Sequence, residues 1–195
     1  MKKKFNERKI RFSDFKQHIW FDDCWCSCAC VNCCSCSICN FLLMYSIDFD
    51  KSIIKNISQL NIDSLFPHEK IISKKSSTLT NFLKSFDDYI IISSIICCSK
   101  SKVIIDGHHR YFTLKKLGFN KIPVTQIDYF SKDIRTGINE ENIKHKIIAD
   151  ALNGNLLEPK STSHKIFSHK SKTWEPIILL SSLSKIEIKN DQENQ

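Results

Sequence analysis

The sequence has no long run of apolar residues. None of its apolar stretches approaches the roughly 20 residues that a helix needs to span a bilayer. The basic start, Met1 to Lys4, is not followed by the apolar stretch of a secretory signal peptide. Glycine and proline contribute only four residues each, which we interpret as a compositional bias of the source. These absences predict a protein without a membrane span, and we expect it in the cytoplasm.

The net charge of +8 is unevenly distributed along the chain. Residues 1–18 hold seven bases against two acids, whereas residues 19–50 hold four acids and no base. The remaining residues carry a positive excess that suits an anionic ligand but is small for a dedicated nucleic-acid binder. Nucleic acid is therefore not the partner that the sequence favours. The segment 1–18 is either an arm that contacts nucleic acid or acidic membrane, or a frayed terminus.

Cysteine is concentrated in one short segment, which holds eight of the ten cysteines. They are Cys24, Cys26, Cys28, Cys30, Cys33, Cys34, Cys36 and Cys39. Their overlapping spacings define no unique tetrahedral zinc set. Three interpretations stay open, namely a low-complexity insertion, a thiolate cluster for soft metals and a site of acylation. In each of them residues 1–45 are an extension and not the working part of the protein.

The hydrophobic pattern predicts one mixed α/β domain over residues 46–188, followed by a disordered tail at 189–195. An amphipathic helix is predicted to begin near Ser76, from the helical spacing of Leu79, Phe82, Leu83 and Phe86. Residues 90–98 form a β-rich run, in which Cys97 and Cys98 are expected to be small core residues. A later helix is predicted to begin at the cap Asn139 and to end at Gly154.

The stretch with the strongest local signal runs from Val103 to Gly118. Three apolar β-formers lead into Asp106-Gly107, and a helical pattern then continues to a glycine suited to a left-handed cap. The first turn of this helix gathers four polar side chains, those of Asp106, His108, His109 and Arg110. Unpaired N–H groups and the positive end of the helix dipole favour anions there. The pattern indicates phosphate chemistry; the structural alternative is a strand–helix turn with a solvated polar tip.

Three motifs, in this order, resemble the ParB/sulfiredoxin superfamily. They are Pro67-His68-Glu69, then Asp106 to Arg110 with the following helix, then Pro159-Lys160-Ser161-Thr162-x-His164, and Ile122-Pro123-Val124 also fits. The chain is most similar to the branch that includes free-serine kinases. Sulfiredoxins have a reactive cysteine where His108 stands here. Chromosome-partitioning ParB proteins carry a downstream helix-turn-helix domain, for which this sequence shows no convincing recognition helix.

The resemblance implies a small-molecule kinase that phosphorylates free L-serine, or a similar hydroxyl compound, with ATP or ADP and Mg²⁺. Glu69 would be the general base, with a pKa raised by partial burial, and Asp106 would orient the hydroxyl or hold Mg²⁺. The nucleotide phosphates would be bound by Gly107, His108, His109 and Arg110. The amino-acid site would be lined by His68, Lys160, Thr162 and His164.

The alternative function is a non-catalytic nucleotide-binding or regulatory ParB-like module that contacts nucleic acid through the basic N-terminus. Nucleic-acid binding that falls steeply with salt would distinguish it from the kinase. The candidate residues also have structural interpretations, as helix-cap or buried imidazoles for His108 and His109 and as plain loop polarity for the rest. The oligomeric state cannot be read from the sequence.

Overall fold

The computed structural model describes residues 41–42, 47–86, 88–138 and 142–187. The cysteine-rich segment, the basic segment 1–18, the tail 189–195 and the predicted cap Asn139 lie outside the described residues, and the domain boundaries stay predictions. In the described part of the chain, no helix is long and apolar enough to cross a bilayer.

A four-stranded mixed sheet forms the centre of the domain, with the strand order β2-β6-β4-β5. Its strands are β2 (Ile54–Asn61), β4 (Ile95–Cys98), β5 (Ile104–Asp106) and β6 (Lys121–Ile127). Strand β4 is parallel to β6, whereas the β2–β6 and β4–β5 pairs are antiparallel. The predicted mixed α/β fold is therefore confirmed.

Two antiparallel three-stranded sheets flank this centre. One has the order β1 (Phe41–Leu42), β10 (Leu183–Glu187), β3 (Tyr89–Ser93), and the other the order β7 (Ile134–Arg135), β8 (Lys165–Ser168), β9 (Thr173–Pro176). Short 3-10 helices are η3 (Lys51–Ile53), η4 (Ile62–Ser64) and η5 (Ile177–Leu180). The β-rich run at residues 90–98 is thus divided between two sheets. The break falls at Ser94, whose backbone N–H donates to the carbonyl of Ser182 at 2.7 Å.

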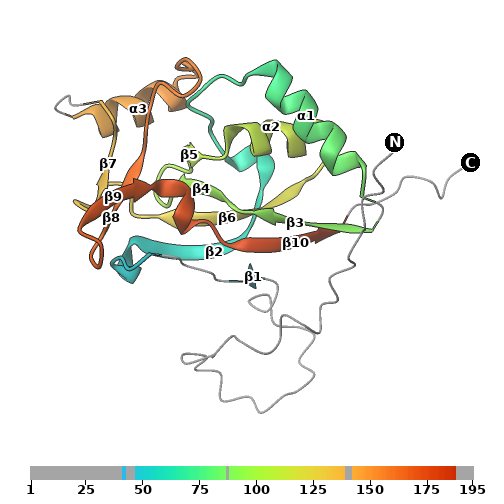
Figure 1. The fold of residues 1–195 in the computed structure, drawn as a ribbon. Helices are drawn as coiled ribbons and strands as arrows, with labels where there is room; N and C mark the ends of the chain where they lie inside the picture. The colour runs from blue at the N-terminus through green and yellow to red at the C-terminus, as the bar shows by residue number, and fades with distance from the viewer. Residues whose placement is uncertain (1–40, 43–46, 87, 139–141, 188–195) are drawn as a thin grey trace, which may run out of the picture. The chain divides into compact units, whose positions relative to one another are not determined.

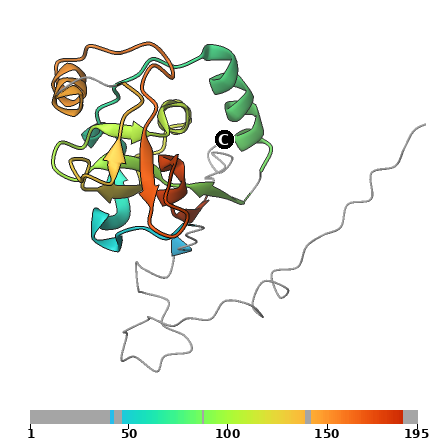
Figure 2. The same ribbon diagram turned by 60° about the vertical axis from the view of Figure 1, so that its left-hand side comes forward.

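The α-helices of the described residues are α1 (Ser73–Lys84), α2 (His108–Lys116) and α3 (Ile143–Leu152). Helices α1 and α2 lie close together (Figures 1 and 2) and pack against the face of the central sheet that carries Ile95 and Cys97, whereas α3 packs against the opposite face. Helix α3 follows Asn142, which has a positive φ of 61°, and is followed by Gly154 with a φ of 77°. The predicted end of this helix is confirmed.

Helix α1 is present as predicted, but its start and its buried face differ from the prediction. It begins three residues before Ser76, and no side chain caps its first turn. The residues that it buries are Ser76, Thr80 and Leu83, whereas Phe82 is 57% exposed. The hydroxyls of Ser76 and Thr113 lie 3.3 Å apart. A polar contact therefore lies beside the apolar packing of Leu79 and Leu83, and the apolar spacing could not reveal it.

Helix α2 follows the strand–turn–helix pattern that its sequence predicts. Gly107 has a φ of 99° and Gly118 a φ of 80°, so both take the left-handed conformation that glycine adopts without strain. The N–H of Tyr111 donates to the Gly107 carbonyl at 2.9 Å and closes the first turn. The side chain of Leu114 is almost fully buried, which fixes α2 against the central sheet.

Strand β4 contributes to two separate hydrophobic clusters. Ile95 and Cys97 belong to one cluster, and Ile96 and Cys98 to the other. Since successive side chains of a strand point to opposite faces, both faces of the central sheet are buried. All four side chains are at most 1% exposed, which confirms the prediction that the two cysteines are core residues.

We expect Leu114→Ala to destabilise the domain by about 2–5 kcal/mol, because it removes a buried side chain and leaves a cavity in the core. Lys116→Ala, on the exposed face of the same helix, should change the free energy of unfolding by less than about 0.5 kcal/mol. Urea unfolding followed by circular dichroism measures both values. Equal effects of the two substitutions would contradict the packing of α2 described above.

Candidate active site

A pocket of about 300 Å³ lies where four separate parts of the chain meet. They are the loop after η4, the β5–α2 turn, the segment before β8, and the β9–η5 junction. The lining residues are Glu69, Ile105, Asp106, His108, Lys160, Thr162, Ser163, His164, Pro176, Ile177 and Ile178. Its volume is at the lower end of the range for small-molecule sites. Six of the ten predicted site residues are thus brought together in one cavity.

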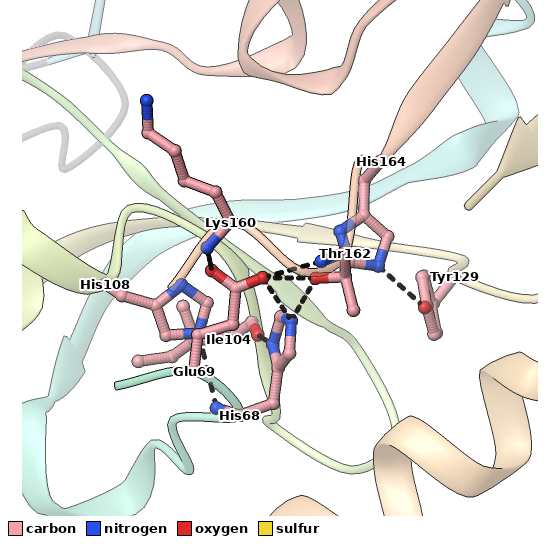
Figure 3. Close-up of polar contacts among 8 residues, drawn as sticks. All are labelled: His68, Glu69, Ile104, His108, Tyr129, Lys160, Thr162 and His164. Carbon is pink, nitrogen blue, oxygen red and sulfur yellow. Dashed lines mark hydrogen bonds and ion pairs between the residues drawn. The ribbon is translucent and has the colours of Figure 1, made fainter. Parts of the chain in front are cut away.

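The carboxylate of Glu69 is the most densely hydrogen-bonded group of the pocket (Figure 3). Its Oε2 accepts the backbone N–H of Lys160 at 3.0 Å. Its Oε1 accepts the backbone N–H of Thr162 at 3.1 Å and the Thr162 hydroxyl at 2.5 Å. An isolated bridge between Glu69 and Leu157 runs beside this contact. The carboxylate therefore fixes the segment 157–162 against the loop that precedes α1.

These donors set the protonation state of Glu69. Burial alone would raise its pKa, but the hydrogen bonds from His68, Thr162 and Lys160 outweigh burial and lower the pKa to about 2. The raised pKa expected from the sequence is therefore wrong. The physical reason is that three of the donors come from residues about 90 positions away in the chain, where sequence spacing cannot register them. Glu69 is ionised at neutral pH.

His68 lies behind Glu69 and does not line the pocket. Its side chain is only 1% exposed. Its Nδ1 lies 2.5 Å from the carbonyl of Ile104, and its Nε2 lies 2.8 Å from the hydroxyl of Thr162. The Nε2 is also 3.7 Å from a carboxylate oxygen of Glu69. The His68 ring therefore connects the backbone of strand β5 to the Thr162 hydroxyl that donates to Glu69.

His108 and His109, on the first turn of α2, accept hydrogen bonds from backbone N–H groups. The Nε2 of His108 accepts the N–H of His68 at 3.2 Å, and the Nε2 of His109 accepts the N–H of Ile72 at 3.0 Å. An imidazolium cannot accept a hydrogen bond, so both rings are neutral in this arrangement. Burial and the neighbouring His68 accordingly lower the pKa of His108 to about 3. His108 lines the pocket, whereas His109 does not.

Arg110 extends away from the pocket toward the junction of strands β3 and β4. Its Nη1 donates to the carbonyl of Ser93 at 2.7 Å and to that of Ser94 at 2.9 Å, and it also contacts the Ser93 hydroxyl. Its Nη2 donates to Asp106 Oδ2 at 2.8 Å. The guanidinium is thereby occupied with protein acceptors, and it supports the β5–α2 turn from behind.

Asp106 is the one acidic residue besides Glu69 that lines the pocket, and its side chain is 37% exposed. In the described part of the chain, no group of three or more His, Cys, Asp or Glu residues could hold a metal ion. Mg²⁺, however, is commonly bound through one or two carboxylates together with substrate phosphates. A single exposed carboxylate beside the start of α2 fits that mode of binding, although Arg110 already contacts one of its oxygens.

His164 and Tyr129 form a buried pair at one side of the pocket. The Tyr129 hydroxyl lies 2.9 Å from Nε2 of His164, and the Tyr129 side chain is fully buried. Burial and the nearby His68 lower the pKa of His164 to about 3. Figure 3 shows the pair on the side of Thr162 opposite to His108.

Sequence reasoning missed Tyr129 and the apolar wall of the pocket. The wall consists of Ile105 from β5 and residues 176–178 at the β9–η5 junction. These residues look like ordinary core positions in the sequence, and no local pattern distinguishes them. The β8–β9 hairpin brings the junction to the site, because Pro176 pairs with Lys165 and the N–H of Ile177 donates to the carbonyl of His164 at 3.2 Å.

The comparisons with known proteins confirm the resemblance to the ParB/sulfiredoxin superfamily and its serine-kinase branch. No protein-family model matches the sequence. Over 79 residues the chain is 34% identical to an ATP-dependent L-serine kinase of Staphylothermus marinus, a match that covers 39% of this chain and 31% of the relative. An ADP-dependent L-serine kinase of Thermococcus kodakarensis is 32% identical over 81 residues, with 39% and 32% covered.

A ParB-like protein of Sulfolobus acidocaldarius is 37% identical over 70 residues, which are 36% of this chain and 34% of the relative. The chain therefore spans about a third of the length of these curated relatives. Among solved structures, a free serine kinase in complex with AMP is 25% identical, with a TM-score of 0.38 and coverage of 49% of this chain and 39% of that one.

The low pKa of Glu69 predicts an acid-dependent loss of stability. Because its folded-state pKa of about 2 lies below the ordinary value of 4.5, the ionised carboxylate stabilises the fold above pH 4.5. This contribution is lost as the pH falls from 4.5 toward 2. We expect Glu69→Gln to be less stable than the wild type by about 1–3 kcal/mol at pH 7, and the difference to shrink at pH 3.

Glu158→Gln is the matched control for this experiment, because Glu158 is an exposed glutamate whose carboxylate accepts from the exposed Lys70 at 2.6 Å. Its effect on the urea midpoint should be small at both pH values. A stability difference between Glu69→Gln and wild type that stays constant from pH 7 to pH 3 would contradict the assignment of an ionised Glu69.

Proposed function

We propose that the domain transfers a phosphoryl group from ATP or ADP to the hydroxyl of free L-serine, which makes it a phosphotransferase with an alcohol acceptor. The observation that supports this most is the 34% identity to a kinase named for L-serine. The pocket is consistent with it, because Glu69, Asp106 and His108 line the same cavity. The product would be O-phosphoserine.

In this proposal Glu69 receives the hydroxyl proton of the substrate. A carboxylate with a pKa of about 2 is a weak base, so its main contribution is to orient the hydroxyl. Phosphoryl transfer passes through a loose transition state in most analyses, in which the nucleophile keeps its proton until late. A weak but always ionised and rigidly held base is sufficient for such a reaction.

The nucleotide phosphates would bind at the first turn of α2. The backbone N–H groups of His108, His109 and Arg110 are the ones that a helix leaves without an intrahelical partner. A Cβ at Gly107 would lie 3.0 Å from Nη2 of Arg110, so glycine at this position lets the guanidinium pack against the turn. Arg110 would act by holding the turn through its carbonyl contacts, and the His109 side chain by fixing the loop before α1.

Asp106 is the residue that would hold Mg²⁺ or orient the hydroxyl. When bound, the ion would neutralise charge on the nucleotide phosphates. The amino-acid substrate would contact Lys160, Thr162 and His164, which line the pocket. His68 is buried behind Glu69, so it would support the substrate site without touching the substrate.

A second candidate function is a non-catalytic ParB-like module that binds nucleotide. The ParB-like relative favours it, as does the low basicity of Glu69. Binding of nucleic acid with a steep dependence on salt, in the absence of serine turnover, would support this second function.

The kinase proposal predicts turnover of L-serine with ATP or ADP in the presence of Mg²⁺, and loss of turnover in EDTA. Glu69→Gln should lower kcat by about 10²-fold or more, since a positioned acid–base group contributes about 10²–10⁴-fold. Asp106→Asn should also lower kcat, because it removes the carboxylate that would hold Mg²⁺ or orient the hydroxyl. Coupled detection of O-phosphoserine measures the rates.

Glu158→Gln, an exposed site outside the pocket, should retain wild-type turnover. Nucleotide binding by each variant, measured by calorimetry, separates a lost catalytic group from a collapsed site. Wild-type protein that binds nucleotide but leaves L-serine unmodified would overturn the kinase proposal.

A further inference from the structure

The hydroxyl of Tyr129 has one hydrogen-bond partner in the described part of the chain, the Nε2 of His164 at 2.9 Å. The Tyr129 side chain is fully buried, and burial raises its pKa, so the phenol keeps its proton. A buried O–H must donate or pay the cost of desolvation. Because Nε2 of His164 is the only acceptor within reach among these residues, the Tyr129 O–H donates to it.

This donation fixes the tautomer of His164. An Nε2 that accepts a hydrogen bond carries no proton, so the proton of the neutral ring is on Nδ1. Nδ1 has no hydrogen-bond partner among the described residues. Among the described residues, every fully buried side-chain nitrogen or oxygen has a hydrogen-bond partner. Because Nδ1 of His164 has none, this atom is not fully buried. Since His164 lines the pocket, the pocket is the space that this nitrogen can face.

We propose that Tyr129 is a positioning residue that locks His164 as an uncharged Nδ1–H donor, which binds an anionic oxygen of the pocket's ligand. The inference rests on the proposed function for the identity of that ligand. A fixed N–H donor attracts a carboxylate or phosphate oxygen and repels an ammonium group. His164 would therefore select the acidic end of an amino acid, or a phosphate of the nucleotide.

The charged and titratable groups around His164 are consistent with a neutral ring. His68 faces it at 5.4 Å between ring centroids, and Glu69 and Lys144 also influence its charge. Lys144, on α3, lies 5.5 Å from the centre of the Tyr129 ring and donates to the carbonyl of Ser131 at 2.9 Å. Protonation of His164 would place a positive charge in a buried site near the ammonium group of Lys144, which is unfavourable.

The first test is the tautomer itself, read from the ¹⁵N and ¹H shifts of the His164 ring in the full-length protein without ligand. We expect the Nδ1–H tautomer in the wild type, unchanged between pH 6 and pH 8. In Tyr129→Phe, which keeps the ring and removes the hydroxyl, we expect a mixture of tautomers. Tyr111→Phe is the matched control, because Tyr111 is also buried and its hydroxyl contacts the carbonyl of Leu65, away from His164.

The second test is ligand affinity, measured by calorimetry with L-serine and with ADP separately. Tyr129→Phe should weaken one of them by about threefold to tenfold, the value of one hydrogen bond, and leave kcat close to the wild type. A loss confined to L-serine assigns the donor to its carboxylate, and a loss confined to ADP assigns it to a phosphate. Tyr111→Phe should weaken neither.

An Nε2–H tautomer in the wild type would overturn the proposal, as would a Tyr129→Phe variant that keeps both the wild-type tautomer and the wild-type affinities. Because the ¹⁵N and ¹H shifts of His164 are recorded without substrate, the tautomer test does not depend on the kinase activity. A protein that shows the fixed tautomer and binds L-serine or ADP through it, but transfers no phosphoryl group, would overturn the kinase proposal and leave this inference supported.

Discussion

The site depends on one buried carboxylate that holds two distant parts of the chain together. Glu69 precedes α1, and three of its donors belong to Lys160 and Thr162, about 90 residues further along the chain. A buried carboxylate without partners would be costly, but three donors make it a stable anchor. Its ionisation, the shape of the pocket and the position of the lining segment all follow from this contact. The anchoring group and the proposed base are therefore the same residue.

A separate contact, made by the guanidinium of Arg110, supports the β5–α2 turn beside the pocket. Arg110 reaches the carbonyls of Ser93 and Ser94, at the point where the chain passes from the β3 sheet to the central sheet. It also contacts Asp106, so the turn before α2 is fixed relative to both sheets. This arrangement gives a rigid first helical turn, which is what an anion site made of backbone N–H groups requires.

The structural features that depend on neighbouring residues could be predicted from the sequence. The strand, the left-handed Gly107, the helix and its end at Gly118 were all predicted, because glycine conformations and helical spacing are properties of neighbouring residues. The motif order also identified residues that the fold brings into one pocket. Long-range features could not be predicted in this way. The direction of Arg110 depends on a sheet break, and the pKa of Glu69 depends on donors about 90 residues away.

The way in which Glu69 holds the lining segment has an evolutionary consequence. At position 160 the carboxylate binds the main-chain N–H, while the Lys160 side chain extends away from it (Figure 3). The hydrogen bond is therefore independent of the side chain at that position, although the φ of 62° at Lys160 disfavours β-branched residues there. Substitutions there by residues that tolerate this conformation can change the lining of the pocket while the contact of Glu69 with the backbone is inherited unchanged.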